Sequence, residues 1–256
     1  MTLAEAALLA LSAAAAGAIN AVAGGGTLIS FPAAVAVGMS PLVANATNAV
    51  ALTPGSIASA FGYRRELAQD RRVLRLFLPA AALGGAIGSV LLLVTPQRLF
   101  DAIVPALVLF ATALLLYQNL RKKKPEGEAA AWDLPERPVV AVLMQLAVGV
   151  YGGYFGAGMG IMMLAILDRI GGTNIHRMNG VKSVLGAAIN AVAAVAFVIA
   201  GAIDYRAAGV MAVGAILGGL LGAAGARRVK PQTVRWGVVA IGFALSAALA
   251  YRRWLT

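Results

Sequence analysis

A long charge-free stretch near the start of the chain limits the fold more than any other feature. From Ala6 through Tyr63 there is not one Asp, Glu, Lys or Arg. A bilayer crossing needs roughly 20 consecutive apolar residues, so this stretch alone can supply two or three crossings. The composition of the whole chain agrees, since 61% of its residues are hydrophobic and only 12% are charged. This charged fraction is about half of that in soluble domains. We therefore predict an all-α polytopic membrane protein.

The composition also excludes several classes of function. The chain has no cysteine, which removes disulfides, thiolate metal sites and thiol catalysis, and His176 is its single histidine. The net charge of +11 comes from short basic clusters beside hydrophobic runs, a pattern typical of cytoplasmic loops that contact anionic headgroups. We therefore expect membrane lipid as a partner, no nucleic acid, no metal and no cofactor. A homodimer is an alternative to a monomer that the composition leaves undecided.

An internal repeat divides the chain. At a shift of 134 positions, Gly24 and Gly26 fall on Gly158 and Gly160. The same shift aligns further glycine and polar residues: Asn45 with Asn179, Asn48 with Lys182, Asp70 with Asp204, Gly84 with Gly218, and Gly88 with Gly222. Most apolar positions in between differ, so the repeated residues are mainly those that bend, pack or bind. Many secondary transporters are duplicated units with the substrate site between the halves.

We predict a first transmembrane repeat over 1–120, a polar cytoplasmic linker over 121–138, and a second transmembrane repeat over 139–256. The linker is the only sustained polar stretch and contains three prolines. The hydrophobic runs that we expect to be helical are 3–23, 42–62, 73–94, 99–118, 138–155, 157–170, 179–200, 206–226 and 233–250.

Basic residues are exchanged between equivalent loops of the two halves. The loop near 63–75 carries five arginines, whereas its counterpart near 197–209 carries only Arg206. Conversely, the turn at 38–45 is uncharged, whereas its counterpart at 168–179 carries arginines. Because basic loops stay in the cytoplasm, this exchange predicts that the two halves are inverted relative to each other.

Inverted halves need an odd number of crossings each. We therefore predict, in each half, a glycine-broken first segment that enters and leaves on one side, followed by three transmembrane helices. This topology places the linker inside and both termini outside. Arg252 and Arg253 in the tail argue for the alternative, in which eight simple crossings form parallel halves.

The two glycine breaks are the first candidate site. Glycine permits backbone angles that other residues avoid, so a helix can open there and expose amide groups that attract anions. Irregular backbone inside a membrane is tolerated only beside protein or a water-filled cavity. Tight helix packing or a simple hairpin turn is the alternative. The candidate residues of the breaks are Gly24, Gly25, Gly26 and the following Thr27, and Gly156, Gly158 and Gly160.

Polar residues inside apolar runs form the second candidate site. Buried amides and hydroxyls cost free energy unless they are paired, so such residues face a bundle interior and either bind substrate or join helices. The candidates are Asn45, Thr47, Asn48 and Ser56 in the first repeat, and Asn179, Lys182, Ser183 and Asn190 in the second.

Lys182 is the most informative of these residues. An ammonium group inside a spanning segment costs roughly 2.5–3.5 kcal/mol, and a single cation among amides and hydroxyls suits a small anionic substrate. Alternatively, the side chain extends to the cytoplasmic surface, since it lies near the helix start. Asp204 and His176 are candidates for proton coupling.

The motifs resemble those of the TauE/SafE family, also called the sulfite exporter or toluene-sulfonate uptake permease family. The similar segments are 24–32 (GGGTLISFP), 44–48 (ANATN), 156–160 (GAGMG) and 179–183 (NGVKS). The resemblance covers nearly the whole chain. It implies a multi-pass transporter in a prokaryotic inner membrane that moves small sulfur-containing or organic anions such as sulfite or sulfonates.

The leading hypothesis is therefore a secondary transporter of small anions that works by alternating access and is driven by protons or the membrane potential. An anion channel and a non-transporting assembly or sensor protein are the alternatives. An enzyme is not expected, because the chain has no cysteine, one histidine and no paired carboxylates within its apolar runs.

Overall fold

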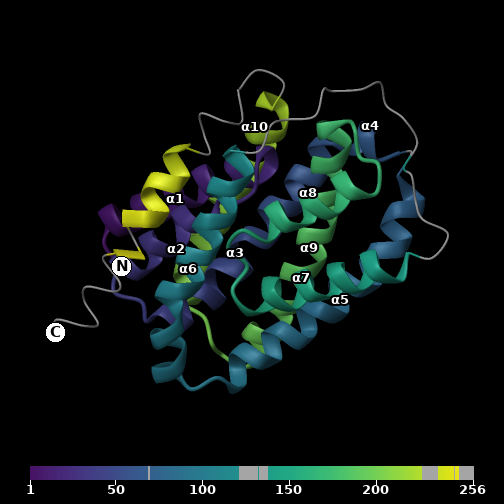
Figure 1. Ribbon diagram of the computed structural model, residues 1–256. Coiled ribbons are helices and arrows are strands. Elements are labelled where there is room, and N and C mark those ends of the chain that lie inside the picture. Colours follow the sequence, from purple (N-terminus) through teal and green to yellow (C-terminus); the bar gives the residue numbers. More distant parts are fainter. Residues whose placement is uncertain (69, 121–131, 133–137, 227–235, 245, 248–256) are drawn as a thin grey trace.

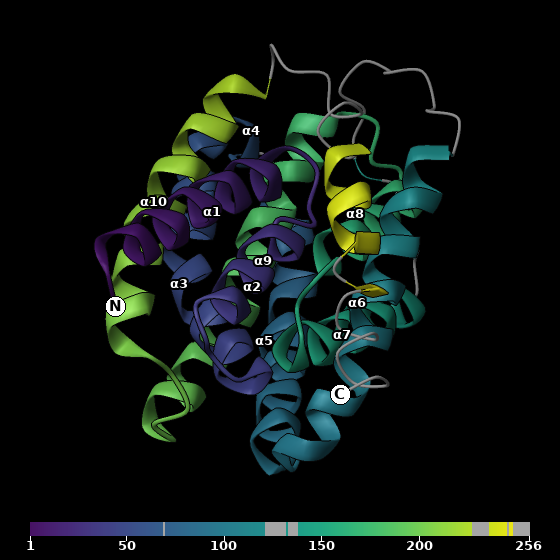
Figure 2. The same cartoon turned by 90° about the vertical axis from the view of Figure 1, so that its left-hand side faces the viewer.

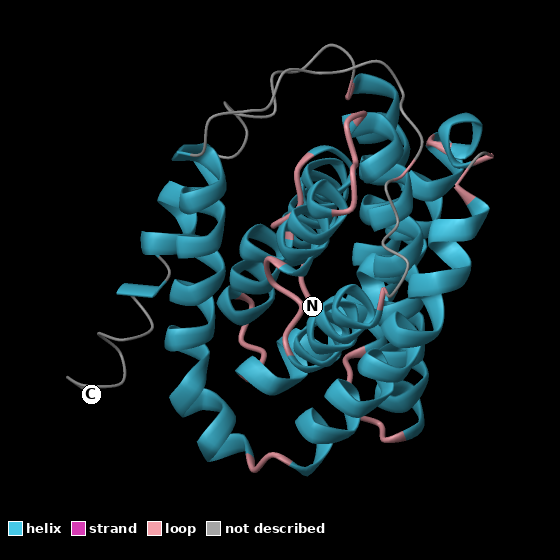
Figure 3. Cartoon of the chain, turned by 45° about the vertical axis from the view of Figure 1, so that its right-hand side comes forward, coloured by secondary structure: helices cyan, strands magenta, loops and turns pink. Residues whose placement is uncertain are grey.

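The computed structural model consists of helices and loops, with no strand in residues 1–68, 70–120, 132, 138–226, 236–244 and 246–247, which are the residues it describes (Figure 1, Figure 3). The all-α prediction is confirmed. The named helices are α1 (Leu3–Val22), α2 (Thr27–Ala36), α3 (Pro41–Gly62), α4 (Arg64–Leu67), α5 (Arg71–Val94), α6 (Gln97–Leu120), α7 (Val139–Tyr154), α8 (Met159–Arg169), α9 (Ile175–Ile199) and α10 (Tyr205–Gly225). Residues 236–244 are helical as well.

Several helices have the length and composition of membrane spans. Within the described residues, five helices are long and apolar enough to cross a bilayer, namely α1, α5, α6, α9 and α10. Their outward faces carry large apolar side chains, such as Leu11, Ile199 and Leu221, which are 71%, 81% and 70% exposed. Apolar surface on this scale suits lipid contact rather than water. The chain is therefore a multi-pass membrane protein.

Both glycine runs interrupt helices. In the first, α1 ends at Val22 and α2 begins at Thr27, and in the second, α7 ends at Tyr154 and α8 begins at Met159. Gly24 has a φ of 79° and the other glycines with positive φ in these breaks are Gly25, Gly156 and Gly158. A residue with a Cβ atom would be strained there. Glycine thus allows each helix to stop and restart inside the bundle.

Each first helix packs against a helix of the other half. α1 lies along α10 and α7 lies along α5 (Figure 2). A Cβ atom added to Gly218 of α10 would lie 1.9 Å from the carbonyl oxygen of Ala14 in α1. The equivalent residue, Gly84 of α5, would bring its Cβ atom to 2.5 Å from the carbonyl oxygen of Leu146 in α7. These glycines therefore allow the helix backbones to approach each other closely.

The central helices α3 and α9 also pack against helices of the other repeat. α3 packs on α9 and α10, and α9 packs on α3 and α5. Gly219 of α10 would direct a Cβ atom at Gly55 of α3, and Gly85 of α5 would direct one at Ile189 of α9. Each of these contacts becomes the other when every residue is replaced by its counterpart 134 positions away. Helices of one repeat therefore pack largely against helices of the other.

Some sequence predictions concern residues outside the described ranges. They include most of the linker 121–138, of which Trp132 and Pro138 are described, parts of the hydrophobic run 233–250, and the tail with Arg252 and Arg253. The division into repeats at 120 and 139 and the inverted orientation remain predictions. The short helix α4 was not anticipated, because it lies in the arginine-rich loop and has little apolar sequence.

The close contact between α1 and α10 predicts a selective effect of small substitutions. Gly218→Ala should lower the free energy of unfolding by about 1–3 kcal/mol, because the added methyl group overlaps the α1 backbone. Gly209→Ala is the matched control on the same helix, where a Cβ atom meets nothing within 4 Å. Unfolding in mixed micelles measures both, and equal stabilities for the two variants would contradict the packing argument.

Candidate functional site

A cavity lies between the two glycine breaks and the polar segments of α3 and α9. Its volume, counted as the space open to the centres of water molecules, is about 50 Å³. Most of the predicted site residues line it: Gly24, Gly25, Thr27, Asn45, Asn48, Ser56, Gly156, Gly160, Lys182, Ser183 and Asn190. The fold therefore brings together residues that are far apart in the sequence.

The two glycine breaks touch at one wall of this cavity. A Cβ atom added to Gly24 would lie 3.2 Å from the carbonyl carbon of Gly160, and one added to Gly160 would lie 3.4 Å from the Cα atom of Gly24. Backbones can approach this closely only where neither residue has a side chain. The start of α2 and the start of α8 are consequently close neighbours beside the cavity.

Two equivalent asparagines satisfy the broken helix ends. The Nδ2 atom of Asn45 in α3 donates a hydrogen bond to the carbonyl oxygen of Tyr154, the last residue of α7, at 2.9 Å. The Nδ2 atom of Asn179 in α9 donates to the carbonyl oxygen of Val22, the last residue of α1, at 3.1 Å. Each repeat therefore caps the broken helix of the other, and buried carbonyl groups gain a partner.

Lys182 lies inside the protein rather than at its surface. It is 5% exposed, and its Nζ atom donates a hydrogen bond to Oδ1 of Asn179 at 2.7 Å. Its aliphatic chain passes over Gly160, where an added Cβ atom would lie 3.3 Å from Cδ of Lys182. The extension of this side chain to the cytoplasmic surface, which was the alternative, does not occur in this structure.

Asn48 occupies the position equivalent to Lys182. It is 2% exposed and lines the cavity, and its Oδ1 atom has no hydrogen-bond partner in the described part of the chain. Buried amide atoms are nearly always hydrogen-bonded, so this one calls for an explanation. Ser56 and Asn190 form a second equivalent pair in the lining. The cavity thus lies where corresponding positions of α3 and α9 meet.

Four predicted residues do not line the cavity and have other contacts. The amide of Gly26 donates to Oδ1 of Asn20 at 2.8 Å, which supports the first break. The Oγ1 atom of Thr47 accepts a hydrogen bond from the amide of Asp204 at 3.0 Å. Gly158 is the N-cap of α8 and packs against α6, and Asn179 caps α1 as described above.

The two proton-coupling candidates lie outside the lining. Asp204 is the N-cap residue of α10, and its Oδ1 atom accepts a hydrogen bond from the amide of Ala207 at 2.9 Å. His176 lies at the start of α9, with its ring centroid 6.4 Å from that of Tyr63. Their role in proton coupling remains a prediction.

Sequence reasoning missed two polar residues of the lining, Asn20 and Ser59. Asn20 interrupts an otherwise apolar run shortly before the first break, and a polar residue at such a place is a usable signal of support for irregular backbone. The Ser59 hydroxyl forms a hydrogen bond of 2.9 Å with that of Ser183 in the other repeat. No spacing rule could have paired these serines, because only the crossing of α3 and α9 brings them together.

Comparison with known proteins identifies the chain's relatives. The model of the family described as "Sulfite exporter TauE/SafE" matches residues 9–249. The chain belongs to the TauE/SafE family. No solved structure matches it.

Relatives of this TauE/SafE protein are named as transporters. A "Probable membrane transporter protein" of Haemophilus influenzae is 27% identical over 91% of this chain and 89% of its own length. The "Probable membrane transporter protein YfcA" of Escherichia coli K12 is 27% identical over 92% and 86% of the two chains. A "Probable membrane transporter protein ORF9" of a Sinorhizobium species is 28% identical over 90% and 87%. The chain is therefore a membrane transporter of the TauE/SafE type, which is not an enzymatic role.

The reciprocal caps predict a stability cost that is specific to their removal. Asn45→Leu should lower the free energy of unfolding by about 1–3 kcal/mol, because the buried carbonyl group of Tyr154 loses its donor. Ser56→Ala is the control, since its hydroxyl only donates within its own helix, to Leu52. Unfolding in mixed micelles compares the two, and a Ser56→Ala variant as unstable as Asn45→Leu would refute the special role of the cap.

Proposed function

We propose that this TauE/SafE protein is a secondary transporter that moves small anions across a prokaryotic inner membrane by alternating access. The substrate class is sulfur-containing or organic anions such as sulfite or sulfonates. The driving force is a proton gradient or the membrane potential. The observation that carries the proposal is the buried Lys182, whose ammonium group belongs to a cavity lining that contains no Asp or Glu among the described residues.

The electrostatics of the cavity favour an anion. None of the residues in its lining is Asp or Glu, whereas Lys182 contributes an ammonium group. The N-termini of α2 and α8 lie at the lining as well, through Thr27 and Met159. Helix N-termini carry partial positive charge and unpaired amide hydrogens, so both attract negative groups. The ammonium group would repel a cation.

The size of the cavity and its side chains favour a small oxyanion. A cavity volume of about 50 Å³ suits an anion with a few heavy atoms rather than a nucleotide or a lipid. Asn48 and Asn190 can each rotate an amide N–H group toward an oxyanion, and the Ser56 hydroxyl lies on the same lining. Multiple donors around one charge match the several oxygen atoms of sulfite or a sulfonate group.

The arrangement of helices supports alternating access between inverted repeats. α1 with α10 and α7 with α5 form two equivalent pairs, and the cavity lies where equivalent residues of α3 and α9 meet. Near-equivalent packing allows the protein to exchange the roles of its two halves at little cost in free energy. The exchange of basic residues between equivalent loops supports the inverted orientation of the two repeats.

Reconstituted vesicles test the proposal. With sulfite, sulfoacetate, taurine and thiosulfate offered in turn, we expect uptake of at least one anion that depends on an imposed pH gradient or potential. Flux without coupling to any gradient would favour the channel alternative. Absence of flux for every anion and every gradient would refute the transporter mechanism in the form stated here.

Substitution of Lys182 tests the site within the same assay. Lys182→Met should weaken anion binding by about 10- to 100-fold, because charge-assisted hydrogen bonds contribute more than neutral ones. Lys182→Arg keeps the charge and should retain part of the affinity. Arg98→Met removes an equal charge from an exposed position outside the lining and serves as the control. Unchanged affinity in Lys182→Met would exclude this residue from substrate binding.

Reporter fusions test the inverted topology. We expect a reporter inserted in the linker 121–138 to lie in the cytoplasm and a reporter at the C-terminus to lie outside, because inverted repeats need an odd number of crossings each. Reporters that are active on only one side of the membrane distinguish the two locations. A cytoplasmic C-terminus would instead support parallel halves with eight simple crossings.

A further inference from the structure

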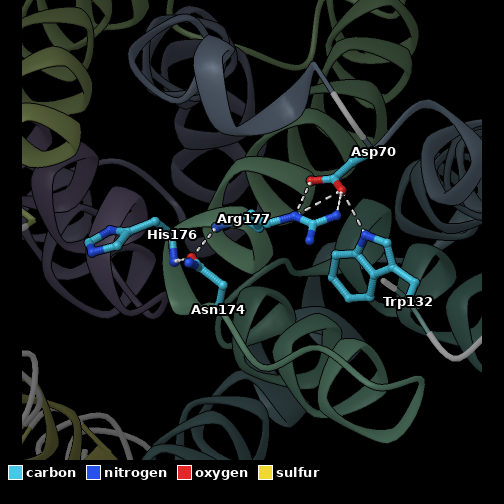
Figure 4. Close-up of polar contacts among 5 residues, drawn as sticks. All are labelled: Asp70, Trp132, Asn174, His176 and Arg177. Atoms are coloured by element: carbon cyan, nitrogen blue, oxygen red, sulfur yellow. Dashed lines mark hydrogen bonds and ion pairs between the residues drawn. The ribbon is translucent and has the colours of Figure 1, made fainter. Parts of the chain in front are cut away.

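Charged and aromatic side chains cluster around the buried Asp70 at one end of the bundle, outside the cavity. Asp70 is 0% exposed and forms an ion pair with Arg177, whose Nε atom lies 3.1 Å from Oδ1 of Asp70. The indole nitrogen of Trp132 donates a hydrogen bond to the same oxygen at 2.7 Å, and the Arg177 guanidinium lies over the Trp132 ring (Figure 4). We name these three residues the Asp70 cluster.

The Asp70 cluster joins three separate parts of the chain. Asp70 is the N-cap residue of α5 in the first repeat, Arg177 lies in the first turn of α9 in the second repeat, and Trp132 belongs to the segment between the repeats. The amides of His176 and Arg177 donate to Oδ1 of Asn174, which holds the start of α9 in place. The cluster therefore ties the start of α9 to the first repeat.

The cluster lies close to the cavity along α9. Arg177 precedes Lys182 by five residues, which is about 7.5 Å along a helix axis at 1.5 Å per residue. Between them, Gly180 faces Tyr63 and Leu67, each 3.1 Å from a Cβ atom added at that glycine. Tyr63 is 2% exposed, and its hydroxyl donates to the carbonyl oxygen of Ala21. Movement of the start of α9 would therefore loosen its packing on Tyr63 and Leu67, about one helical turn beyond the lining residues Ser59 and Ser183.

Among the residues that the structure describes, the opposite end of the bundle has no equivalent ion pair. Asp204 is the counterpart of Asp70, but Val43 stands at the counterpart of Arg177. The Asp204 carboxylate accepts a hydrogen bond from Ala207 of its own helix, and its amide donates to Thr47. Phe197, the counterpart of Tyr63, is buried, so both ends have an aromatic residue while only one has the charged cluster.

We propose that the Asp70 cluster is the cytoplasmic gate of the transporter, which keeps this end closed until the Asp70–Arg177 ion pair breaks. The proposal rests on alternating access as the proposed function. The loop near 63–75 with its five arginines places this end in the cytoplasm. An ion pair that is largely shielded from water costs much free energy to separate, because each charge then loses its partner. The closed and the open form are therefore two distinct states rather than a continuum.

Thiol labelling tests the gate directly, because the natural chain has no cysteine to replace. Ser59→Cys places a reporter thiol at the cavity lining. In inside-out vesicles, a membrane-impermeant maleimide should label it about tenfold faster or more when Asp70→Asn is added, since loss of one partner shifts a two-state equilibrium toward the open form. Labelling from the opposite face should not accelerate.

Matched variants separate gating from general loosening. Asp204→Asn changes the counterpart residue at the other end and should not accelerate labelling from the cytoplasmic face. Exchange of the charges, with Asp70→Arg and Arg177→Asp together, should restore slow labelling. Trp132→Phe removes the indole donor while it keeps an aromatic ring, and it should give an intermediate rate. If Asp70→Asn fails to fold, the exchanged pair and Trp132→Phe provide the same comparison.

Two results would overturn the gate. One is equal labelling rates for Asp70→Asn and Asp204→Asn from the cytoplasmic face, and the other is faster labelling from both faces alike. The assay requires no anion transport, so a wrong substrate class leaves its outcome unchanged. Conversely, normal sulfite or sulfonate flux with unchanged labelling in Asp70→Asn would refute the gate while leaving the proposed function intact.

Discussion

The backbone groups exposed at the two helix breaks are the constraint on which the rest of this structure depends. Within a bilayer a carbonyl group has no water to pair with, so a helix can stop there only if the protein supplies a donor. Asn45 and Asn179 supply it, each to the last residue of the broken helix in the other repeat. The breaks of one repeat therefore need the central helix of the other. A single repeat would leave both its broken helix and its asparagine without partners.

Close backbone contacts make these reciprocal caps geometrically accessible. Since helices in lipid gain no hydrophobic free energy from association, they depend on dense packing between small residues. Gly84 and Gly218 allow α5 to contact α7 and α10 to contact α1. These pairs surround α3 and α9, whose polar faces then meet at the cavity. Glycine thus acts in two ways in this protein, by ending helices at the breaks and by permitting contact between helices elsewhere.

Charge departs from the near-symmetry of the packing at two places. At the cavity, Lys182 occupies the position in the second repeat that is equivalent to Asn48 in the first. At one end of the bundle Arg177 pairs with Asp70, whereas the equivalent residues at the other end are Val43 and Asp204. Shape complementarity between the halves tolerates such changes, because they alter few contacts of the backbone. In the proposed mechanism, the similar halves exchange roles, while the charges define what binds and which end is held closed.

The sequence by itself determined the helical membrane class, the positions of both breaks, and most of the polar residues at the cavity, because hydropathy, glycine and buried polar residues act locally along the chain. The tertiary structure alone decided the partners. Thr47 and Asn179 turn to hydrogen-bond other elements, whereas Asn20 and Ser59 join the lining. Arg177 pairs with Asp70 across 107 positions of sequence. Such pairings depend on where helices cross, and the crossings follow from the sum of many small packing contacts that no local pattern encodes.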